Sequence, residues 1–422
     1  MTERLTVRLA DRPEPRVVGE MVDAGSGPYF QYDSAFLATG LQLSPLALPL
    51  RLDAYEPGPR NLGRLRGLFA DAVPDGWGLK MLHQSMTDAG LDPLRASQLM
   101  HLRAVGARAM GALTFHPSAL KETRATPFDL EAVAANALRV DADDVEEILP
   151  ALKRAGGTSG GARPKVVVTW HPDGTIGDAF APLPEGFRHV LVKFRSHEDW
   201  RDSPAIESAY LAMAERAGLI VPMHRVLHLK SGEQALIVDR FDRVGDQRRH
   251  IHTLAGMLEI DTSAALVDYE QLLKVTARIT EDMQQVKAAW RRAVFNVAAF
   301  NRDDHAKNIA FKMGLTGRWS LAPAYDLTFS SGRGGYHAMS VAGESREPTR
   351  AHLERLAVDL NAAHVAQIFD EVRSATELWK GFAERAGVST PHIKEVDKQL
   401  RRQSLALGRR DTAKPRSPRK RR

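Results

Sequence analysis

The sequence predicts an α+β fold of two lobes, with a small mixed N-terminal subdomain and a largely helical C-terminal lobe. Short strand-like runs broken by Gly, Pro and Asn occupy roughly the first 115 residues. β-branched strands and amphipathic helices then alternate to about residue 240. From about Ile260 the pattern is mainly helical, and one helical stripe is formed by Met283, Val286, Trp290, Val294 and Val297.

The length of 422 residues allows a sizeable core and two or three domains or lobes. Composition shifts suggest an N-terminal subdomain over 1–115 and a strand-containing lobe with a Gly-rich loop over 116–240. A helical lobe is expected over 241–408, followed by a basic tail over 409–422.

The composition excludes several classes of chemistry. The chain contains no cysteine, which excludes disulfides, zinc–thiolate sites and cysteine nucleophiles. Its first residues, MTERLTVRLADR, are charged and strand-like, unlike an apolar signal, and no run approaches 18 apolar residues. We therefore expect a soluble, cytoplasmic protein with no membrane partner.

The formal net charge of +6 is concentrated at the C-terminus. Residues Arg409 to Arg422 contain eight Lys or Arg and one Asp, which leaves the other 408 residues near −1. Pro415 and Pro418 argue against a helix, so the tail is predicted to be disordered. A solubilising or tag-like tail and a nucleic-acid contact both fit this composition.

The N-terminal subdomain is predicted to contain four strands and a group of helices. The strand-like runs are LTVRLAD, RVVGEMVD, YFQYD and LALPLRLD, and helices follow from about Leu62 to Val105. Within them lies PDGWG, Pro74 to Gly78, where the proline suits a first helical turn. Trp77 is expected to be a packed anchor and not a ligand-stacking residue.

A Gly-rich segment, GGTSGGARPK, connects two amphipathic runs, FDLEAVAANAL and DDVEEILPALKRA, to the strand KVVVTW. Glycines allow backbone N–H groups to converge on an anion, and Arg163 and Lys165 add positive charge. The segment is not a Walker A loop, because GxxxxGK[ST] is absent and a strand follows it. Taken alone, it fits an ordinary Gly hairpin as well as a phosphate loop.

The next run, RHVLVKF, is a predicted buried strand that carries Lys193. This ammonium either reaches solvent at an edge or has a partner. The helix SPAIESAYLAMAERAGL follows with Glu207 in its first turns, which is the layout of the kinase Lys–Glu pair that grips the α- and β-phosphates. Two strands come next, MHRVLHL and QALIVDRFDR. The second ends in polar residues, as would a linker that touches an adenine edge.

The segment FNRDDHAKN crowds ionisable groups at the end of an apolar helix. Asp303 and Asn308 have the D-x-x-x-x-N spacing of the protein-kinase catalytic loop, in which Asp accepts a hydroxyl proton and Asn binds Mg²⁺. After a short strand, LAPAYDLTFS supplies Asp326 in the place of the second metal-binding Asp. Lys307 is positioned to neutralise a transferring phosphoryl group. His305 is interpreted as a structural brace in preference to a chemical group, and Asp304 as a solvated neighbour.

The order of these elements resembles one family in particular. The matching stretches run from about residue 28 to 330 and are YFQYD, PDGWG, SGGARPK, LVKF, IESAYLAMAERAGL, VDRFDR, RDDHAKN and LAPAYDL. The chain resembles the HipA family, the kinase toxins of bacterial type II toxin–antitoxin systems. This resemblance implies a two-lobed, protein-kinase-like fold that uses ATP and Mg²⁺. It implies phosphorylation of serine or threonine in a protein such as an aminoacyl-tRNA synthetase. It also implies a helix-turn-helix, HipB-like antitoxin and repression of operator DNA by the complex.

The resemblance assigns roles residue by residue. Asp303 would be the catalytic base, Asn308 and Asp326 would hold Mg²⁺, and Lys193 would contact the phosphates. Asp239, Arg240 and Phe241 would flank the adenine, and the nucleotide site would also include His305 and Tyr325. The phosphate loop would consist of Gly160, Gly161, Ala162, Arg163, Pro164 and Lys165. The family's self-phosphorylated serine corresponds here to Thr158, with Ser159 beside it, so either residue is a candidate acceptor. The tail lies outside the resemblance, and the sequence shows no fused antitoxin domain.

Two alternatives belong to other classes of protein. A metal-dependent hydrolase would use Asp303, Asp304 and His305 as ligands, and would leave Lys193 and the Gly-rich loop unexplained. A catalytically silent co-repressor would serve as a structural partner of a DNA-binding antitoxin, with its basic tail against operator DNA.

Overall fold

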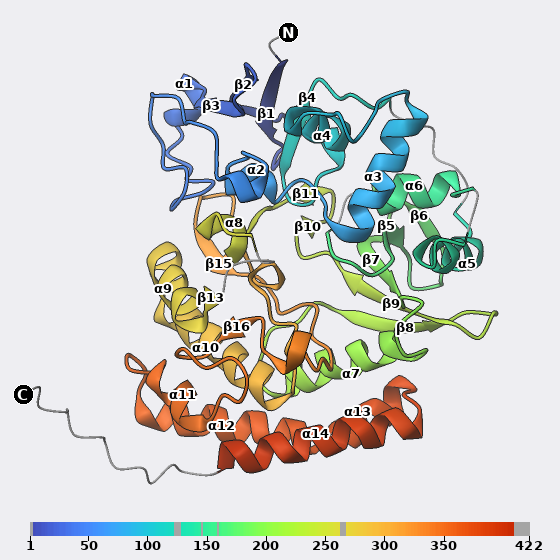
Figure 1. Ribbon diagram of the computed structural model, residues 1–422, viewed down its shortest axis with the longest axis vertical. Coiled ribbons are helices and arrows are strands. Elements are labelled where there is room, and N and C mark those ends of the chain that lie inside the picture. The colour runs from blue at the N-terminus through green and yellow to red at the C-terminus, as the bar shows by residue number, and fades with distance from the viewer. Residues whose placement is uncertain (1–2, 122–127, 145–146, 158–159, 262–266, 409–422) are drawn as a thin grey trace, which may run out of the picture.

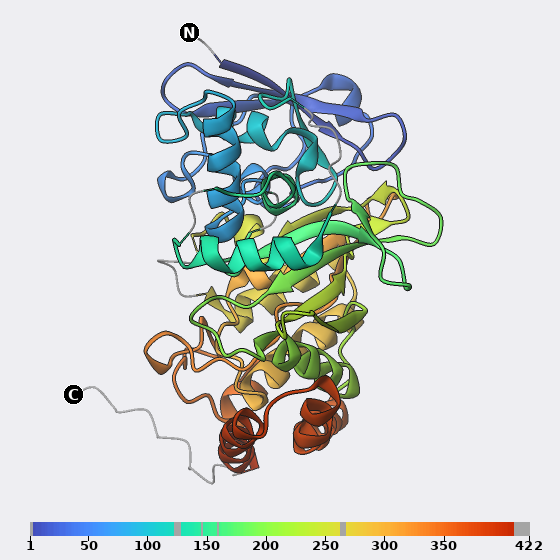
Figure 2. The ribbon, with the colours of Figure 1, turned by 90° about the vertical axis from the view of Figure 1, so that its right-hand side faces the viewer.

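The computed structural model describes residues 3–121, 128–144, 147–157, 160–261 and 267–408. The predictions for Thr158, Ser159 and the tail at 409–422 lie outside the described residues. The molecule is elongated, with an N-terminal sheet at one end, a second sheet in the middle and a layer of helices at the other end (Figures 1 and 2). The predicted α+β architecture of two lobes is therefore observed.

The N-terminal sheet is antiparallel and has the strand order β3-β2-β1-β4. Its strands are β1 (Glu3–Leu9), β2 (Arg16–Asp23), β3 (Pro28–Tyr32) and β4 (Leu113–His116). Alternate residues of β1, namely Leu5, Val7 and Leu9, are fully buried, as expected for a strand with one covered face. The first three predicted strands are confirmed.

The fourth predicted strand, LALPLRLD at residues 46–53, is wrong, because the structure has turns and irregular backbone there. Pro45 and Pro49 lack the N–H that a strand donates to its neighbour, which explains why the apolar pattern does not produce one. Instead, the carbonyl of Leu48 accepts a hydrogen bond of 2.7 Å from the Tyr32 hydroxyl.

Short helices connect β3 to β4. They are α1 (Ser34–Leu37), η1 (Arg60–Leu62), α2 (Gly67–Ala70), α3 (Gly76–Asp88), α4 (Gln98–Val105) and η2 (Gly106–Arg108). The sequence suggested that Pro74 lies in a first helical turn. In the structure it lies before the N-cap Asp75 and therefore precedes the first turn of α3.

The second sheet is also antiparallel and has the order β6-β5-β7-β9-β8. Its strands are β5 (Lys165–Trp170), β6 (Ile176–Asp178), β7 (Arg188–Phe194), β8 (His224–His228) and β9 (Gln234–Asp239). Its helices are α5 (Leu130–Asp141), α6 (Pro150–Gly156) and α7 (Ser203–Arg216). Trp77 and Met81 of α3 share one hydrophobic cluster with α5, α6 and β5, which holds the start of α3 beside the Gly-rich segment.

The C-terminal lobe is mainly helical, as predicted. Its helices are α8 (Leu254–Leu258), α9 (Tyr269–Thr280), α10 (Met283–Ala298), η3 (Ala306–Asn308), η4 (Arg333–Gly335), α11 (Arg350–Arg355), α12 (Ala362–Glu377), α13 (Trp379–Ala386) and α14 (Thr390–Gly408). Its short strands are β10 (Arg243–Val244), β11 (Gln247–Arg248), β12 (His250–Thr253), β13 (Val267–Asp268), β14 (Ala310–Met313), β15 (Trp319–Leu321) and β16 (Met339–Ser340).

The stripe predicted on α10 forms the centre of this lobe. Val286, Trp290, Val294 and Val297 are buried, whereas Met283 in the first turn is about half exposed. The Trp290 indole N–H donates to the carbonyl of Leu353 at 2.9 Å, so the polar atom of this buried ring is satisfied. None of the helices within the described ranges is long and apolar enough to cross a membrane.

Candidate active site

Lys193 lies near the end of β7 and is clamped between two carboxylates. Its Nζ donates to Glu207 Oε1 on α7 at 2.5 Å and also to Asp326. The side chains of Lys193 and Glu207 are each about 10% exposed. Burial opposes the charge, yet Asp326 and Glu207 hold the pKa of Lys193 above its ordinary value. The structure therefore confirms the strand-lysine and helix-glutamate pair, and shows that the ammonium has partners.

Lys165 begins the neighbouring strand β5 and lies directly opposite Lys193 in the antiparallel register. Side chains paired in this way lie on the same face of a sheet, so two ammonium groups face the same space. Lys165 Nζ donates to the carbonyl of Gly160 at 2.7 Å. Burial, opposed in part by Asp326 and reinforced by the nearby Lys193 charge, lowers the pKa of Lys165.

The Gly-rich segment is held from several sides. Arg163 forms two hydrogen bonds with the carboxylate of Asp199, at 2.7 and 3.1 Å. Pro164 is buried, and its carbonyl accepts from the backbone N–H of Phe194 at 2.9 Å. Gly161 has a φ of +101°, in the region that favours glycine. The exposed Gly160 and Ala162 flank it, so residues 160–162 form the outer part of this loop.

Asp75, the N-cap of α3, connects this loop to Lys307. Its carboxylate accepts from the backbone N–H of Gly161 and from Lys307 Nζ, the latter at 2.6 Å. Although partial burial opposes it, Lys307 holds the pKa of Asp75 below its ordinary value. Sequence reasoning missed Asp75, although it had singled out the PDGWG segment that contains it.

The next two residues of this segment also touch the loop. Gly76 has a φ of +49°, and a Cβ built there would lie 2.7 Å from the carbonyl oxygen of Gly161, so only glycine fits. Trp77 is buried, its backbone N–H donates to Gly161 O, and its indole N–H donates to Lys165 O, each at 3.0 Å. The predicted packing role of Trp77 is confirmed.

The segment Asn301–Asn308 lies between α10 and β14. Side chains hold it in place by hydrogen bonds to its backbone carbonyls. The Asn308 amide donates to the carbonyl of Asp303 at 2.8 Å, and the buried Arg292 donates to the carbonyl of Asn308 at 2.6 Å. The Tyr325 hydroxyl donates to Lys307 O at 2.8 Å. The carboxylate of Asp303 is left about half exposed at the surface of this rigid turn.

Asp304 is not the solvated neighbour that the sequence suggested. It is buried and accepts from the Tyr269 hydroxyl at 2.7 Å and from the backbone N–H of Ala338 at 2.9 Å. His337 Nδ1 lies 2.9 Å from the same carboxylate. Asp304 therefore anchors the loop from within. Because its carboxylate is buried and engaged by these partners, it does not fit the ligand set of the hydrolase alternative.

His305 lies close to two carboxylates, those of Asp303 and Asp326. Its Nε2 is 3.9 Å from Asp303 Oδ1, and its positive form would also be close enough to act on Asp326. Its Nδ1 is buried and forms no hydrogen bond within the described residues. The ring therefore lies near both acidic groups, and within the described part of the chain the expected bracing hydrogen bond from Nδ1 is not observed.

Asp326 adopts a φ of +52°, an uncommon backbone conformation for a residue with a Cβ. Its carboxylate is about one-third exposed. Desolvation opposes ionisation, but Lys193 and Lys165 hold the pKa of Asp326 well below its ordinary value. Next to it, the ring of Tyr325 lies 5.3 Å from that of Phe241, which connects this segment to the linker after β9.

The linker residues divide into two groups. Asp239 ends β9, and its Oδ1 is buried without a hydrogen-bond partner in the described part of the chain. Burial raises the pKa of this carboxyl, although Arg188 opposes the shift. Arg240 is turned elsewhere, because its buried guanidinium binds Asp242 at 2.9 and 2.7 Å. In the sheet register Asp239 lies opposite Val190, on the face of Ile237 that packs against α5 and α6, whereas Lys193 lies on the other face. The structure therefore brings Phe241 toward the candidate site, but not the side chains of Asp239 and Arg240.

Comparisons with known proteins agree with this architecture. The HipA-like C-terminal domain model matches residues 157–379, and the HipA N-terminal domain model matches residues 7–116. Among solved structures, the chain is similar to HipA of Shewanella oneidensis MR-1, solved in a complex with HipB and operator DNA. That match has a TM-score of 0.70 and 20% identity, and covers 96% of this chain and 97% of that one.

A second structure, the Helicobacter pylori proinflammatory kinase CtkA, has a TM-score of 0.38 and 11% identity, over 53% of this chain and 89% of that one. The comparison with curated proteins gives no match.

The fold and the charged groups at its centre define a two-lobed, kinase-like protein of the HipA type. The C-terminal family model alone spans more than half of the chain. The chain therefore belongs to the HipA family, and the resemblance inferred from its motifs is confirmed.

Proposed function

We propose that this protein is an ATP- and Mg²⁺-dependent serine/threonine protein kinase that acts as the toxin of a toxin–antitoxin module. The observation that carries the proposal is the clamp of Lys193 between Glu207 and Asp326. In protein kinases, a strand lysine held by a helix glutamate positions the phosphates of ATP, and an aspartate beside it holds Mg²⁺.

The cationic groups of the site fit a triphosphate. Lys193 and Lys165 present two ammonium groups on one face of the sheet, and the glycines of residues 160–161 allow close approach of backbone N–H groups. At the other end of the site, the linker Asp239–Phe241 begins at the end of β9, and we expect it to flank the adenine. Phe241 and Tyr325 offer ring faces between these two ends.

The donor set also fits a hard divalent cation. Asp326 and Asn308 provide carboxylate and amide oxygens, which Mg²⁺ prefers, and they leave room for water and phosphate oxygens. When bound, Mg²⁺ supplies charge neutralisation to the phosphates. The low pKa of Asp326 keeps its carboxylate ionised for this role across the physiological range.

Asp303 is the group that receives the proton of the attacking hydroxyl. Its carboxylate is half exposed, whereas its backbone is fixed through Asn308. A rigid backbone with an accessible carboxylate suits a general base that must meet a protein substrate. Lys307, now paired with Asp75, is the cation that neutralises the transferring group once Asp75 releases it.

The regulatory part of the proposal rests on the family and on the Shewanella complex. That HipA was solved with HipB and operator DNA. By analogy, we assign to this chain a helix-turn-helix antitoxin and operator co-repression through the complex, with a translation component such as an aminoacyl-tRNA synthetase as substrate. Thr158 and Ser159 are candidate acceptors for self-phosphorylation, which would add about −1.5 to −2 charge beside the phosphate site and oppose ATP binding.

Transfer of the labelled γ-phosphate of ATP to protein tests the proposal. We expect transfer by the wild type, and a loss of at least about 100-fold in Asp303→Asn at unchanged folding, which is the size of a lost general base. Asp53→Asn, an exposed carboxylate of the N-terminal subdomain, is the matched control and should transfer normally.

The alternatives give other results in the same assay. Near-normal transfer by a folded Asp303→Asn variant would remove Asp303 from the role of base. A wild type that transfers no phosphate to any protein, itself included, would support the silent co-repressor. Hydrolytic turnover without a nucleotide would support the metal-dependent hydrolase.

Mass spectrometry of the wild type and of a Thr158→Ala, Ser159→Ala variant tests the self-phosphorylation.

A further inference from the structure

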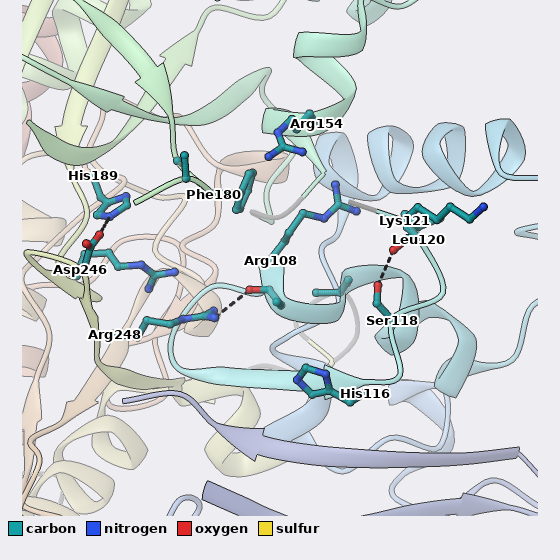
Figure 3. Close-up of a pocket in the computed structure, with 15 residues that line it drawn as sticks. Arg108, His116, Ser118, Leu120, Lys121, Arg154, Phe180, His189, Asp246 and Arg248 are labelled. Atoms are coloured by element: carbon teal, nitrogen blue, oxygen red, sulfur yellow. Dashed lines mark hydrogen bonds and ion pairs between the residues drawn. The ribbon is translucent and has the colours of Figure 1, made fainter. Parts of the chain in front are cut away.

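A second polar region lies away from the Lys193 clamp, where the N-terminal subdomain meets the second sheet. A cavity of about 400 Å³ opens there between η2 and the end of β4 on one side, and α6, β7 and the β10–β11 hairpin on the other. Five cationic side chains line it: Arg108, Lys121, Arg154, Arg243 and Arg248. We call it the basic cavity (Figure 3).

Two arginines of the basic cavity, Arg108 and Arg248, are held by backbone carbonyls. Arg248 donates to the backbone carbonyls of Gly111, Ala107 and Ala109, at 2.8, 2.9 and 2.6 Å. Arg108 donates to the carbonyl of Ala104 at 3.2 Å. Among the described residues, no carboxylate oxygen lies within 4 Å of either guanidinium. Carbonyls satisfy N–H groups but do not neutralise the charge.

The carboxylates that are present are shared or already engaged. Asp242 binds Arg243 at 2.6 Å and also the buried Arg240. Asp178 binds Arg154 at 2.7 Å. Asp246 is mostly exposed and lies 3.5 Å from His189 Nε2, while Nδ1 of this buried histidine has no hydrogen-bond partner within the described ranges.

The electrostatic consequence is visible on three of the cations, Arg108, Arg243 and Arg248. Burial, together with the nearby Arg154, lowers the pKa of Arg108. Burial and Arg240 lower the pKa of Arg248 to about 10, and burial lowers that of Arg243 to about 8 in spite of Asp242. Figure 3 shows Arg108 and Arg154 reaching into the same space from different elements. Like charges held together out of water favour a bound counter-ion.

The rest of the lining indicates what kind of anion fits. The volume lies in the range of small-molecule sites and far exceeds that of one inorganic ion. Phe180, Leu120 and Val105 form an apolar part of the wall, and the guanidinium of Arg154 lies 5.6 Å from the Phe180 ring centre. Guanidinium groups bind phosphate oxygens in pairs, so several arginines suit adjacent phosphates.

We propose that the basic cavity binds a small molecule that carries a pyrophosphate group attached to an apolar or planar moiety, such as a nucleoside polyphosphate. This site is separate from the proposed kinase site and does not depend on it. A bound ligand would contact η2 and β4 on one side and β7, β10 and β11 on the other, so it would tie the N-terminal subdomain to the second sheet.

Pyrophosphate is the probe for the test, titrated calorimetrically in EDTA with full-length protein and matched ionic strength. We expect Arg108→Gln and Lys121→Gln each to weaken binding, the former about tenfold, as for a lost hydrogen bond between charged groups. Arg108→Lys should recover part of the affinity. Arg225→Gln, an exposed arginine on β8, should bind as the wild type does.

Pyrophosphate also resembles part of ATP, so Lys193→Met identifies the site that is occupied. The proposal expects binding that survives Lys193→Met, and hydrogen–deuterium exchange that slows at residues 105–121 and 243–248. It is overturned if Lys193→Met abolishes all binding, if Arg108→Gln and Lys121→Gln both bind normally, or if the wild type does not bind. If a substituted protein fails to fold, hydrogen–deuterium exchange of the wild type with and without pyrophosphate decides whether the basic cavity is occupied.

Discussion

The candidate active site and the basic cavity both gather cations, but they balance them differently. In the candidate active site, Lys193 meets Glu207 and Asp326, and Lys307 meets Asp75. Beside the basic cavity, Asp242 serves Arg240 and Arg243 together, and Asp178 serves Arg154. Carboxylates of the chain neutralise Lys193 and Lys307 directly, whereas Arg108 and Arg248 have no carboxylate partner within the described residues.

This difference has a thermodynamic meaning. A buried ion pair is expensive to break, because removing one partner leaves an uncompensated charge. An unmatched buried cation already carries that cost in the folded state, so removing it costs little. The candidate active site should therefore be sensitive to the loss of a cation, whereas the basic cavity should tolerate it and respond to an added anion.

The largest expected effect is on the free energy of unfolding. Lys193→Met leaves Glu207 and Asp326 facing each other, and should lower the free energy of unfolding by about 3 kcal/mol. Arg108→Gln removes an unmatched cation and should change it by less than about 1 kcal/mol. Urea unfolding of both variants measures the contrast. Equal losses would show that the two regions do not differ in charge balance.

The second effect concerns metal dependence in the candidate active site. Asn308→Ala and Asp326→Ala should each weaken nucleotide binding in Mg²⁺ by about tenfold more than in EDTA, because each removes an oxygen ligand. Asn308→Ala is the cleaner variant, since Asp326 also holds Lys193. Fluorescence titration with a labelled nucleotide under both conditions measures the ratio. A ratio near one would indicate packing damage and no metal role.

The sequence predicted the parts of the site that depend on local spacing. Lys193 and Glu207 lie 14 residues apart on adjoining elements, and Asp303 and Asn308 lie in one turn. Strand and helix periodicity fix the orientation of such residues, so their placement follows from the pattern.

The parts that were missed depend on distant partners. Asp304 is buried because His337 and Tyr269, 33 and 35 residues away, reach it. Asp75 meets Gly161 across 86 residues. A single sequence does not indicate which polar side chain will be covered by a remote element, so Asp304 was misjudged and Asp75 was overlooked. The basic cavity is formed by several separated segments and was missed for the same reason.

The third effect tests whether a phosphate of ATP can replace the Asp75 carboxylate as the partner of Lys307. Asp75 neutralises Lys307 and binds the Gly161 N–H, so an incoming phosphate has to replace this carboxylate. Asp75→Asn should therefore tighten ATP binding by up to about fivefold, the value of a half-exposed ion pair. Asp88→Asn, which removes a similar pair with Lys153 at the far end of α3, is the control. Weaker ATP binding by Asp75→Asn would mean that Asp75 supports the loop and does not compete with phosphate.

The smallest effect is on the pH dependence of stability, and it comes from the basic cavity. Burial, Arg240 and Arg243 lower the pKa of His189 below its ordinary value of 6.5, although Asp246 opposes the shift. The unfolded chain therefore takes up this proton before the folded one does. The stability contributed by neutral His189 is complete above pH 6.5 and is lost as the pH falls below that value.

His189→Gln should show a flatter decline in the free energy of unfolding between pH 7 and about pH 5 than the wild type does. Asp75 and Asp326 of the candidate active site do not contribute in this interval, because their pKa values lie below the ordinary carboxyl value. Pyrophosphate should also flatten the wild-type curve, since an added anion offsets the arginine charges that lower the pKa of His189. Parallel curves for wild type and His189→Gln would show that the charges of the basic cavity do not reach this histidine.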